Sequence, residues 1–280
     1  MAVVFLRRRK LGATSCRETI KQMVQEASVV RNDQGYEQLI AEDDLVVRWG
    51  CTSTVPARKV LNTAKAIHLV SDKTKFRRML EINELCPPTY FNREDIPEGA
   101  LERSVVVRPR LHAQGRHLYV ANNKEQLDNA IRRCGVGWYA ADLINKVAEY
   151  RVCCSQGRVV WVAKKNPANP DDVAWNVAQG GNFENVRWDA WPLKAVKVAL
   201  QGFELSGLDF GGVDIMVDAD GYATILEINS APSITSPYRQ SCMAKLFDYI
   251  FTNGKERITL IGERGGYRKF IHPSVCDRAV

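Results

Sequence analysis

Residues 211–232 read GGVDIMVDADGYATILEINSAP, a pattern typical of two antiparallel strands joined by a tight turn. Apolar and polar side chains alternate from Val213 to Asp218, which is the two-residue period of a strand with one buried face. Asp220 and Gly221 favour a two-residue turn because both can adopt positive φ. The alternation resumes at Tyr222, so the stretch predicts a β-hairpin.

The predicted turn fixes which residues face one another across the hairpin. It pairs Ala219 with Tyr222, and counting outward places Asp214 directly opposite Glu227, with Asn229 on the same face. Two facing carboxylates repel and raise each other's pKa, and a divalent cation between them removes this repulsion. Oxygen ligands of this kind suit Mg²⁺. The alternative is an ordinary solvent-facing hairpin that carries acidic residues.

Composition indicates a soluble globular protein with a substantial core. The chain has 280 residues, of which 45% are hydrophobic and 25% charged, enough for one large domain or two to three small ones. The net charge is +7 and the isoelectric point about 9.0. This charge suits an anionic ligand such as a nucleotide, an acidic peptide or RNA, or it serves general solubility.

The cysteines and the N-terminal residues suggest a reduced, cytoplasmic environment. The eight cysteines have no metal-binding spacing, and we expect reduced thiols, several of them buried. The apolar run 1–6 precedes the basic residues 7–10, the reverse of the order in a secretory signal. No apolar run reaches the roughly 18 residues of a membrane span. The basic run is either a solvated surface or a contact for an acidic partner.

Short strands and helices alternate along the rest of the chain. Strands are predicted at 3–6, 45–47, 105–110, 118–121, 138–144, 149–154, 158–162 and, in part, 258–261. Helices are predicted at 16–26, 124–134, 188–205 and 238–251, and another follows an N-cap at Ser71 or Asp72 and ends before Pro87. The first strands and helix fit a small α/β unit. Arg48, at a strand end, either contacts a substrate or pairs with an acid.

The loop between the strands at 105–110 and 118–121 combines Gly115 with His112, Arg116 and His117. A flexible loop that offers backbone N–H groups beside positive charge can cover phosphates. A single glycine is a weak signal, however, and an ordinary hairpin turn is the alternative.

In this order, the pieces resemble the ATP-grasp carboxylate–amine ligases, most closely the branch of the ribosomal-protein glutamate ligases. The resemblance covers roughly residues 60–250. Its strongest part is the pair of motifs 212–214 (GVD) and 226–232 (LEINSAP). Weaker parts are 60–62 (VLN), 71–73 (SDK), 107–109 (VRP), 149–151 (EYR), 175–176 (WN), 180–181 (GG) and 207–209 (GLD).

The resemblance implies an α+β protein with the ATP-grasp fold, in which two α+β lobes sandwich the nucleotide. A small α/β domain at residues 1–71 would precede the lobes. The first lobe would cover 72–145, the second lobe 146–251, with the metal site in the second. A C-terminal tail, 252–280, has no assigned role.

The resemblance also implies roles for individual residues. The metal ligands would be Asp214, Glu227 and Asn229. The nucleotide phosphates would meet Lys73 and Arg108, beneath a loop that carries His112 and Gly115. Adenine would meet the backbone of Asp142, Leu143 and Ile144. The transferred phosphate and the substrate carboxylate would face Arg151, Lys164 and Asn176.

Some of these residues have simpler interpretations, and the chain departs from the family pattern. Lys73 could be a surface lysine, Asp142 a strand-end acid, and Arg151 a partner of Glu149. Arg108 stands where the family usually has lysine, which keeps the charge and adds bidentate geometry. Asp142 replaces the usual glutamate, and the glycine-rich lid is reduced. These changes bear on nucleotide affinity more than on the metal site.

The activity that the resemblance implies is ATP- and Mg²⁺-dependent, with Mn²⁺ as a substitute metal. A carboxylate would attack the γ-phosphate, and an amine would displace phosphate from the acyl phosphate to leave an amide. The partners would be an amino acid or amine and a carboxylate on a small molecule, peptide or protein, and ligases of this type often form homo-oligomers. Alternatives are a kinase with the same fold, a non-catalytic nucleotide-binding module, and RNA binding, which rests on charge alone.

Overall fold

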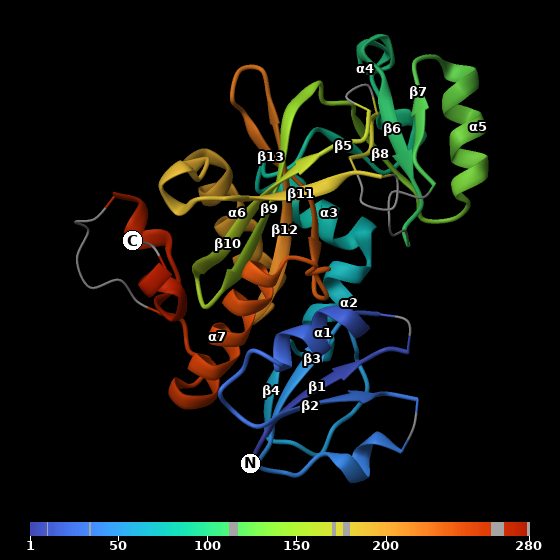
Figure 1. Ribbon diagram of the computed structural model, residues 1–280. Helices are drawn as coiled ribbons and strands as arrows, with labels where there is room; N and C mark the ends of the chain where they lie inside the picture. The colour runs from blue at the N-terminus through green and yellow to red at the C-terminus, as the bar shows by residue number, and fades with distance from the viewer. Residues whose placement is uncertain are drawn as a thin grey trace.

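The structure is a computed structural model that describes residues 1–9, 11–33, 35–111, 117–169, 172–175, 180–258 and 266–278. The described residues form three β-sheets with helices packed around them (Figure 1). The N-terminal sheet lies at one end of the molecule, a four-stranded antiparallel sheet at the other, and a five-stranded antiparallel sheet between them.

The N-terminal sheet is parallel, and its strand order is β2-β1-β3-β4. Its strands are β1 (Val3–Arg7), β2 (Ala27–Arg31), β3 (Leu45–Trp49) and β4 (Lys59–Leu61), with α1 (Ala13–Ile20) and a 3₁₀ turn (Tyr36–Leu39). This arrangement is the expected small α/β unit. The helix expected at 16–26 begins and ends earlier. Strands β2 and β4 were not predicted, since their consecutive apolar residues, Val29–Val30 and Val60–Leu61, are too few to show a strand period.

The four-stranded sheet has the order β5-β8-β6-β7. Its strands are β5 (Thr89–Tyr90), β6 (Val105–Arg108), β7 (Tyr119–Ala121) and β8 (Tyr139–Asp142), accompanied by α4 (Glu98–Arg103), α5 (Lys124–Cys134) and a 3₁₀ turn (Arg93–Asp95). Two helices, α2 (Ala64–Ser71) and α3 (Lys73–Ile82), precede it. Asp72 caps α3 by accepting a hydrogen bond from the Lys75 amide at 3.2 Å, which confirms the predicted helix start.

The five-stranded sheet has the order β11-β10-β9-β12-β13. Its strands are β9 (Lys146–Ser155), β10 (Arg158–Asn166), β11 (Asn182–Val186), β12 (Phe210–Asp218) and β13 (Ala223–Asn229). The helix predicted at 188–205 is divided by Pro192 into a 3₁₀ turn (Trp188–Ala190) and α6 (Leu193–Ser206), because proline cannot donate within a helix. The last helix is α7 (Pro237–Asn253), followed by 3₁₀ turns at Gly266–Phe270 and Pro273–Arg278. The strand expected at 258–261 falls largely outside the described residues.

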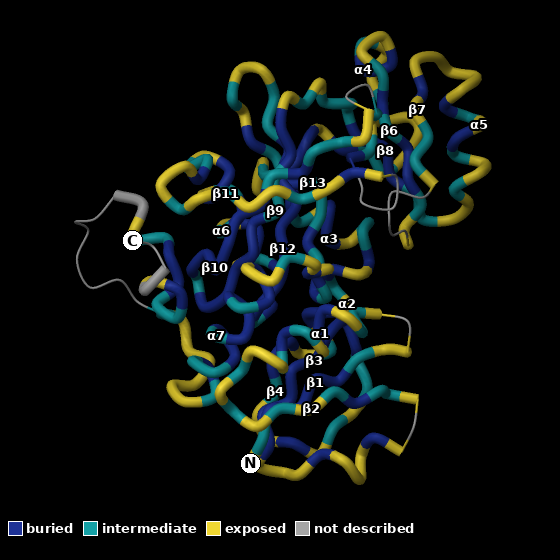
Figure 2. Tube along the Cα trace, viewed as in Figure 1, coloured by how far each residue is buried: buried dark blue, intermediate teal, exposed yellow. Residues whose placement is uncertain are grey.

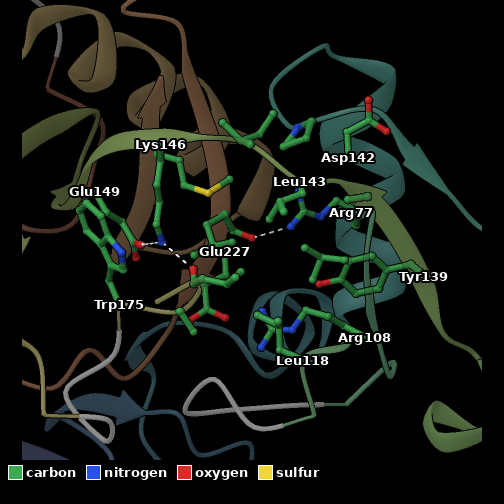
Figure 3. A pocket seen from close by; sticks show the side chains of 18 residues that line it. Arg77, Arg108, Leu118, Tyr139, Asp142, Leu143, Lys146, Glu149, Trp175 and Glu227 are labelled. Atoms are coloured by element: carbon green, nitrogen blue, oxygen red, sulfur yellow. Dashed lines mark hydrogen bonds and ion pairs between the residues drawn. The ribbon is translucent and has the colours of Figure 1, made fainter. Parts of the chain in front are cut away.

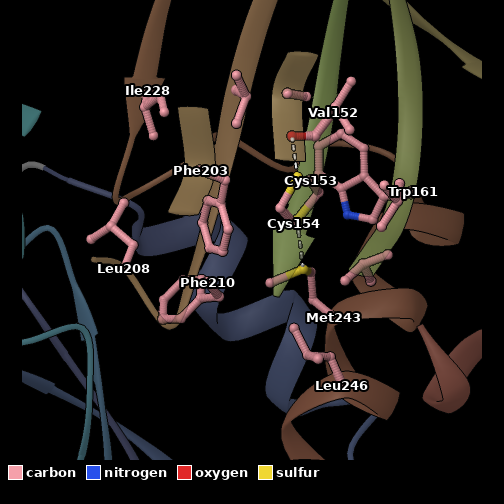
Figure 4. Close-up of a cluster of buried hydrophobic side chains, with 14 of the residues drawn as sticks. Val152, Cys153, Cys154, Trp161, Phe203, Leu208, Phe210, Ile228, Met243 and Leu246 are labelled. Carbon is pink, nitrogen blue, oxygen red and sulfur yellow. Dashed lines mark hydrogen bonds between the residues drawn. The ribbon is translucent and has the colours of Figure 1, made fainter. Parts of the chain in front are cut away.

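The two faces of the five-stranded sheet are covered differently. Helix α6 packs on one face, where Gly202 lies against Ile225. Helix α7 covers part of the opposite face, where Met243 Sδ lies 3.5 Å from Cys153 Sγ in a buried apolar cluster (Figure 4). Strands β9, β10 and β12 are buried along most of their length (Figure 2). The rest of the α7 face points toward the four-stranded sheet, and the candidate site lies there.

The central hairpin, β12–β13, has the predicted pairing of Asp214 with Glu227 but not the predicted turn. The Asp218 amide donates to the Tyr222 carbonyl at 3.1 Å, so the loop is residues 219–221 rather than a two-residue turn. Nearer the acids, a β-bulge adds Leu226 to β13 between the Ile215–Ile225 and Asp214–Glu227 pairs. The longer loop and the bulge cancel, which restores the predicted register at the acids.

Arg77 of α3 holds this bulge in place. Its Nη2 donates to the Leu226 carbonyl at 2.8 Å and its Nη1 to the Ile225 carbonyl at 3.3 Å. On the same segment, the Ile225 amide donates to the Leu85 carbonyl at 2.7 Å. The position of Glu227 therefore depends on a buried arginine from a different element.

All eight cysteines are free thiols, and six of them are buried, as predicted. Burial raises the pKa of several, for example that of Cys16 to about 12, although Arg7 acts in the opposite direction. Within the described residues, no helix is long and apolar enough to cross a membrane.

Candidate functional site

A pocket lies between the four-stranded and the five-stranded sheets (Figure 3). The four-stranded sheet and the connection that follows it contribute residues from Val106 to Ile144, and the five-stranded sheet contributes Lys146, Glu149, Met216, Leu226 and Glu227. Arg77 from α3 and the segment 173–175 complete the lining. We call these two sides the four-stranded wall and the five-stranded wall.

The five-stranded wall carries a buried chain of alternating charges. Arg151 binds both oxygens of Asp214, with 2.6 Å from Nε to Oδ1 and 2.8 Å from Nη2 to Oδ2. Lys165 Nζ lies 3.0 Å from Asp214 Oδ2 and also binds Glu149. Lys146 Nζ lies 2.6 Å from Glu149 Oε2. Each of these charges therefore has at least one partner of opposite sign.

Strand register explains why these side chains meet. Asp214 pairs with Arg151 across β12 and β9, and Lys165 pairs with Glu149 across β10 and β9. Since alternate residues share a face, all four lie on one face of the sheet. The register therefore builds the cluster without any long-range loop.

The network sets the pKa values of its members. Burial alone would raise the pKa of Asp214, but Arg151 and Lys165 outweigh burial and leave that pKa below its ordinary value. Burial would lower the pKa of Lys165, yet Asp214 and Glu149 raise it. Lys146 differs, because burial lowers its pKa more than Glu149 raises it. Asp214 and Lys165 are thus held in their charged forms.

Glu227 is more exposed than Asp214. Its Oε1 accepts from Asn229 Nδ2 at 3.1 Å, and its Oε2 lies 3.8 Å from Lys73 Nζ. Lys73 Nζ also donates to the Ile228 carbonyl at 3.3 Å. The Glu227 side chain is 21% exposed, whereas that of Asp214 is 1% exposed. Lys73 therefore lies beside the acids and is not a free surface lysine.

The oxygen atoms of Asp214, Glu227 and Asn229 fit a hard divalent cation, but only one of the two Asp214 oxygens has a lone pair available. Asp214 Oδ2 accepts from both Arg151 and Lys165, which uses both of its lone pairs, whereas Oδ1 accepts from Arg151 only. A cation would therefore reach Asp214 through Oδ1. Among the described residues, no group of three or more His, Cys, Asp or Glu could hold a metal, so the Asn229 amide oxygen would be needed as a third ligand.

The four-stranded wall holds a cation of a different kind. Arg108 ends β6 and lines the pocket, and its Nε is buried without a hydrogen-bond partner. Within the described part of the chain, Arg108 forms no ion pair with an acidic residue. An arginine in this state suits an incoming anion such as a phosphate.

The connection after β8 also lines the pocket, through Asp142, Leu143 and Ile144. The Asp142 carboxylate turns away to Tyr90, whose hydroxyl donates at 2.9 Å, and to Arg103 at 3.2 Å. The amides of Asp142 and Leu143 donate to backbone carbonyls. The Ile144 amide has no partner among the described residues.

The structure brings most of the predicted residues together, but Lys165 takes the place predicted for Lys164. Lys165, not Lys164, reaches Asp214, and Lys164 points to the opposite face because successive residues of β10 alternate. Arg151 pairs with Asp214 rather than with Glu149. Arg48 donates to the Ser53 carbonyl at 2.9 Å. His112, Gly115 and Asn176 lie outside the described residues.

The sequence assigned no site role to Arg77, Tyr139, Lys146 and Glu149, which line the pocket, or to Lys165, which binds Glu149. The only available signal was strand alternation from Arg151, which places Glu149 on the same face. Trp175, whose ring lies 4.6 Å from Lys146 Nζ, was noticed only as part of a motif.

Comparisons with known proteins agree with this architecture. No protein-family model matches the chain. Probable alpha-L-glutamate ligase 2 from Hahella chejuensis is 24% identical over 203 residues, which span 68% of this chain and 66% of that protein.

Solved structures match over a larger share of the chain. D-alanine–D-alanine ligase from Bacillus anthracis, complexed with ATP, aligns with a TM-score of 0.64 at 15% identity, over 91% of this chain and 97% of that one. The ATP-grasp ligase PsnB, complexed with a minimal precursor, Mg and ADP, aligns with a TM-score of 0.62 at 13% identity, over 91% and 97%. The chain therefore has the ATP-grasp fold that its motifs predict.

Proposed function

We propose that the protein is an ATP- and Mg²⁺-dependent ligase that activates a carboxylate as an acyl phosphate and joins it to an amine. The observation that carries this proposal is the pocket itself. One wall presents Arg108, a cation without an acidic partner among the described residues, and the other presents Glu227 beside the buried Asp214. A triphosphate with a divalent cation complements both walls.

Different residues hold the phosphates, the adenine and the metal ion. The phosphates meet Arg108, which lines the pocket, and Lys73, which lies beside Glu227. Adenine accepts a hydrogen bond from the Ile144 amide, which has no partner among the described residues. Asp214 Oδ1, Glu227 and Asn229 hold Mg²⁺, which would neutralise phosphate charge when bound.

The buried network keeps the acids ready for this task. Arg151 and Lys165 hold Asp214 ionised and fixed, so that no proton has to leave before a cation binds. Asn176 stays a predicted contact of the substrate carboxylate. The chemistry is mainly positioning and charge neutralisation, in agreement with the absence of a Ser/His/Asp arrangement in the sequence.

The substrates are an amine, most simply an amino acid, and a carboxylate on a small molecule, a peptide or a protein. The relatives support this breadth: one is named a probable glutamate ligase, one joins D-alanine to D-alanine, and PsnB was solved with a precursor. The net charge of +7 suits an acidic acceptor.

The test is release of phosphate from ATP in the presence of Mg²⁺, screened over amino acids paired with acidic peptides. E227Q keeps the shape of the side chain and removes the charge, so turnover should fall at least about 100-fold. E184Q is the matched control, because Glu184 is an exposed acid on β11 of the same sheet and should leave turnover unchanged.

Product analysis completes the test. Free phosphate together with a new amide supports the ligase, whereas phosphate retained on the acceptor identifies a kinase with the same fold. Turnover in E227Q equal to the wild type would end the assignment of Glu227.

A further inference from the structure

A second cavity lies at the end of β9 and β10 that is remote from the candidate site. These strands carry Glu149 and Lys165 near one end, and at the other end they are joined by the turn at Gln156 and Gly157, which lines the cavity. The rest of the lining comes from α6, from the α6–β12 connection and from the segment after α7. The volume of about 580 Å³ falls within the range of about 300–1,000 Å³ that is typical of sites for small organic ligands.

The segment after α7 is fixed over the β9–β10 turn by buried polar side chains. Gln156 Nε2 donates to the carbonyls of Gly254 and Glu256 at 3.3 and 2.6 Å. The Ile258 amide donates to the Gln156 carbonyl at 3.1 Å. The ring of the buried His272 completes this contact, with Nε2 2.8 Å from Gln156 Oε1. The segment to which the sequence assigned no role therefore forms one side of the cavity.

Positive charge predominates in this cavity. Among the described residues, five basic and two acidic side chains line it, and they are Arg158, Lys197, Lys255, Arg257, Lys269, Glu204 and Asp209. Arg257 Nη1 lies 2.5 Å from Glu204 Oε1. Lys255 Nζ lies 3.4 Å from Asp209 Oδ1. Each acid is thus paired with one cation, and the other three cations have no acidic partner in the described part of the chain.

Arg158, one of these three cations, distinguishes the cavity from an ordinary solvated surface. It is only 8% exposed, and burial lowers its pKa, as does the neighbouring charge of Arg257. Two of its five N–H donors are used, by the carbonyls of Gly157 and Ile258 at 2.8 and 2.7 Å. Because a carbonyl carries no net charge, the positive charge of Arg158 stays unbalanced and favours an anion in the cavity.

Lys197 and Lys269 add positive charge from two other elements. Lys197 is exposed on α6, and Lys269 lies in the 3₁₀ turn that follows α7, with its Nζ 5.4 Å from the centre of the Phe270 ring. Leu200 and Phe270 are partly buried and line the cavity as well. The cavity therefore combines three cations that lack acidic partners with an apolar surface.

We propose that this cavity binds a phosphorylated small molecule, with its phosphate at these three cations and its organic part on Leu200 and Phe270. A phosphomonoester carries about two negative charges at pH 7, which matches several unbalanced cations better than the single charge of a carboxylate does. This inference does not depend on the proposed ligase function, because the described residues that line the cavity are separate from those that line the candidate site.

The first experiment titrates the full chain with phenyl phosphate, by calorimetry near neutral pH and at constant ionic strength. The wild type should bind with a millimolar or lower Kd, and K197M/K269M should bind at least about tenfold more weakly. Neither lysine is buried, so this variant should melt close to the wild type. No binding to the wild type up to about 10 mM, or equal affinity in the two proteins, would overturn the site.

K194M is the matched control, because Lys194 is also an exposed lysine on α6 but does not line the cavity. It should bind phenyl phosphate as the wild type does. R108M controls for the candidate site and should also bind normally. A loss of affinity in R108M as large as that in K197M/K269M would place the phosphate at the candidate site and overturn this proposal.

The second experiment repeats the titration with benzoate and with single-stranded oligouridylate. Benzoate has the same ring with one negative charge, so it should bind at least about tenfold more weakly than phenyl phosphate. Equal affinity for the two would overturn the choice of phosphate. Binding of the oligonucleotide that depends on Lys197 and Lys269, without binding of phenyl phosphate, would identify a nucleic-acid surface and overturn the small-molecule site.

Discussion

The two walls of the pocket hold their charges in opposite ways. On the five-stranded wall, Arg151, Lys165 and Glu149 are buried and paired around Asp214. On the four-stranded wall, Arg108 lines the pocket with no described acid beside it, and Asp142 is directed away to other partners. The charges of the first wall are balanced within the folded chain, whereas that of Arg108 suits an incoming anion.

This difference separates stability from binding. Removing a member of a paired buried network leaves another charge without its partner, so the folded state should suffer. Removing an unpaired cation should cost the fold little and should instead reduce affinity for a ligand. The predictions below test this separation.

The largest effect is expected for D214N. Asparagine has nearly the same shape but leaves Arg151 and Lys165 buried without their shared carboxylate. We expect the free energy of unfolding to fall by about 3–5 kcal/mol. Urea unfolding followed by circular dichroism measures this change.

E227Q provides the internal control for D214N, since the Glu227 side chain is 21% exposed and that of Asp214 only 1%. Its free energy of unfolding should change by about 1 kcal/mol or less. Equal losses in the two variants would show that the five-stranded wall is not a buried network centred on Asp214.

R108M should give a smaller free-energy change, and in binding rather than in folding. Loss of a charged donor to phosphate corresponds to about 1.5–3 kcal/mol, so affinity for Mg-ATP should fall about 10–100-fold while the unfolding midpoint stays near that of the wild type. Titration calorimetry measures the affinity. R133M, at an exposed arginine on α5 of the same lobe, should bind Mg-ATP normally.

A pH series should show the smallest effect. Because the pKa of Asp214 is below its ordinary value of 3.8 in the folded chain, its contribution to stability is fully present above that value. The contribution is lost as the pH falls through the folded pKa. The stability difference between the wild type and D214N should therefore stay constant above about pH 4 and shrink below it. A difference that shrinks already near neutral pH would contradict this.

The sequence was sufficient to predict the fold and the pairing of Asp214 with Glu227. However, the pairing was derived from a two-residue turn that the structure does not have. Alternation and turn residues are local signals, and they located both strands. The bulge at Leu226 is specified by Arg77, which is distant in sequence, so no local pattern reveals it. The predicted turn was wrong, and the bulge compensated for the error.

The other differences arise where the local sequence carries no decisive signal. Choosing between Lys164 and Lys165 needs the register of β10, and an irregularity between Val159 and Trp161 makes counting along that strand unreliable. Strand β11 was missed because Asn182–Val186 is largely polar and exposed. No direction was predicted for the Asp142 carboxylate, because it depends on Tyr90 and Arg103, which the sequence does not place beside it.

The hydrogen bonds that Arg77 and Leu85 form with β13 also separate the hairpin tip, residues 219–221, from the candidate site at Glu227. These hydrogen bonds fix the strand between the tip and Glu227. A longer loop at the tip should therefore leave the position of that carboxylate unchanged. We therefore expect a reporter peptide inserted at the tip to leave the position of Glu227 unchanged.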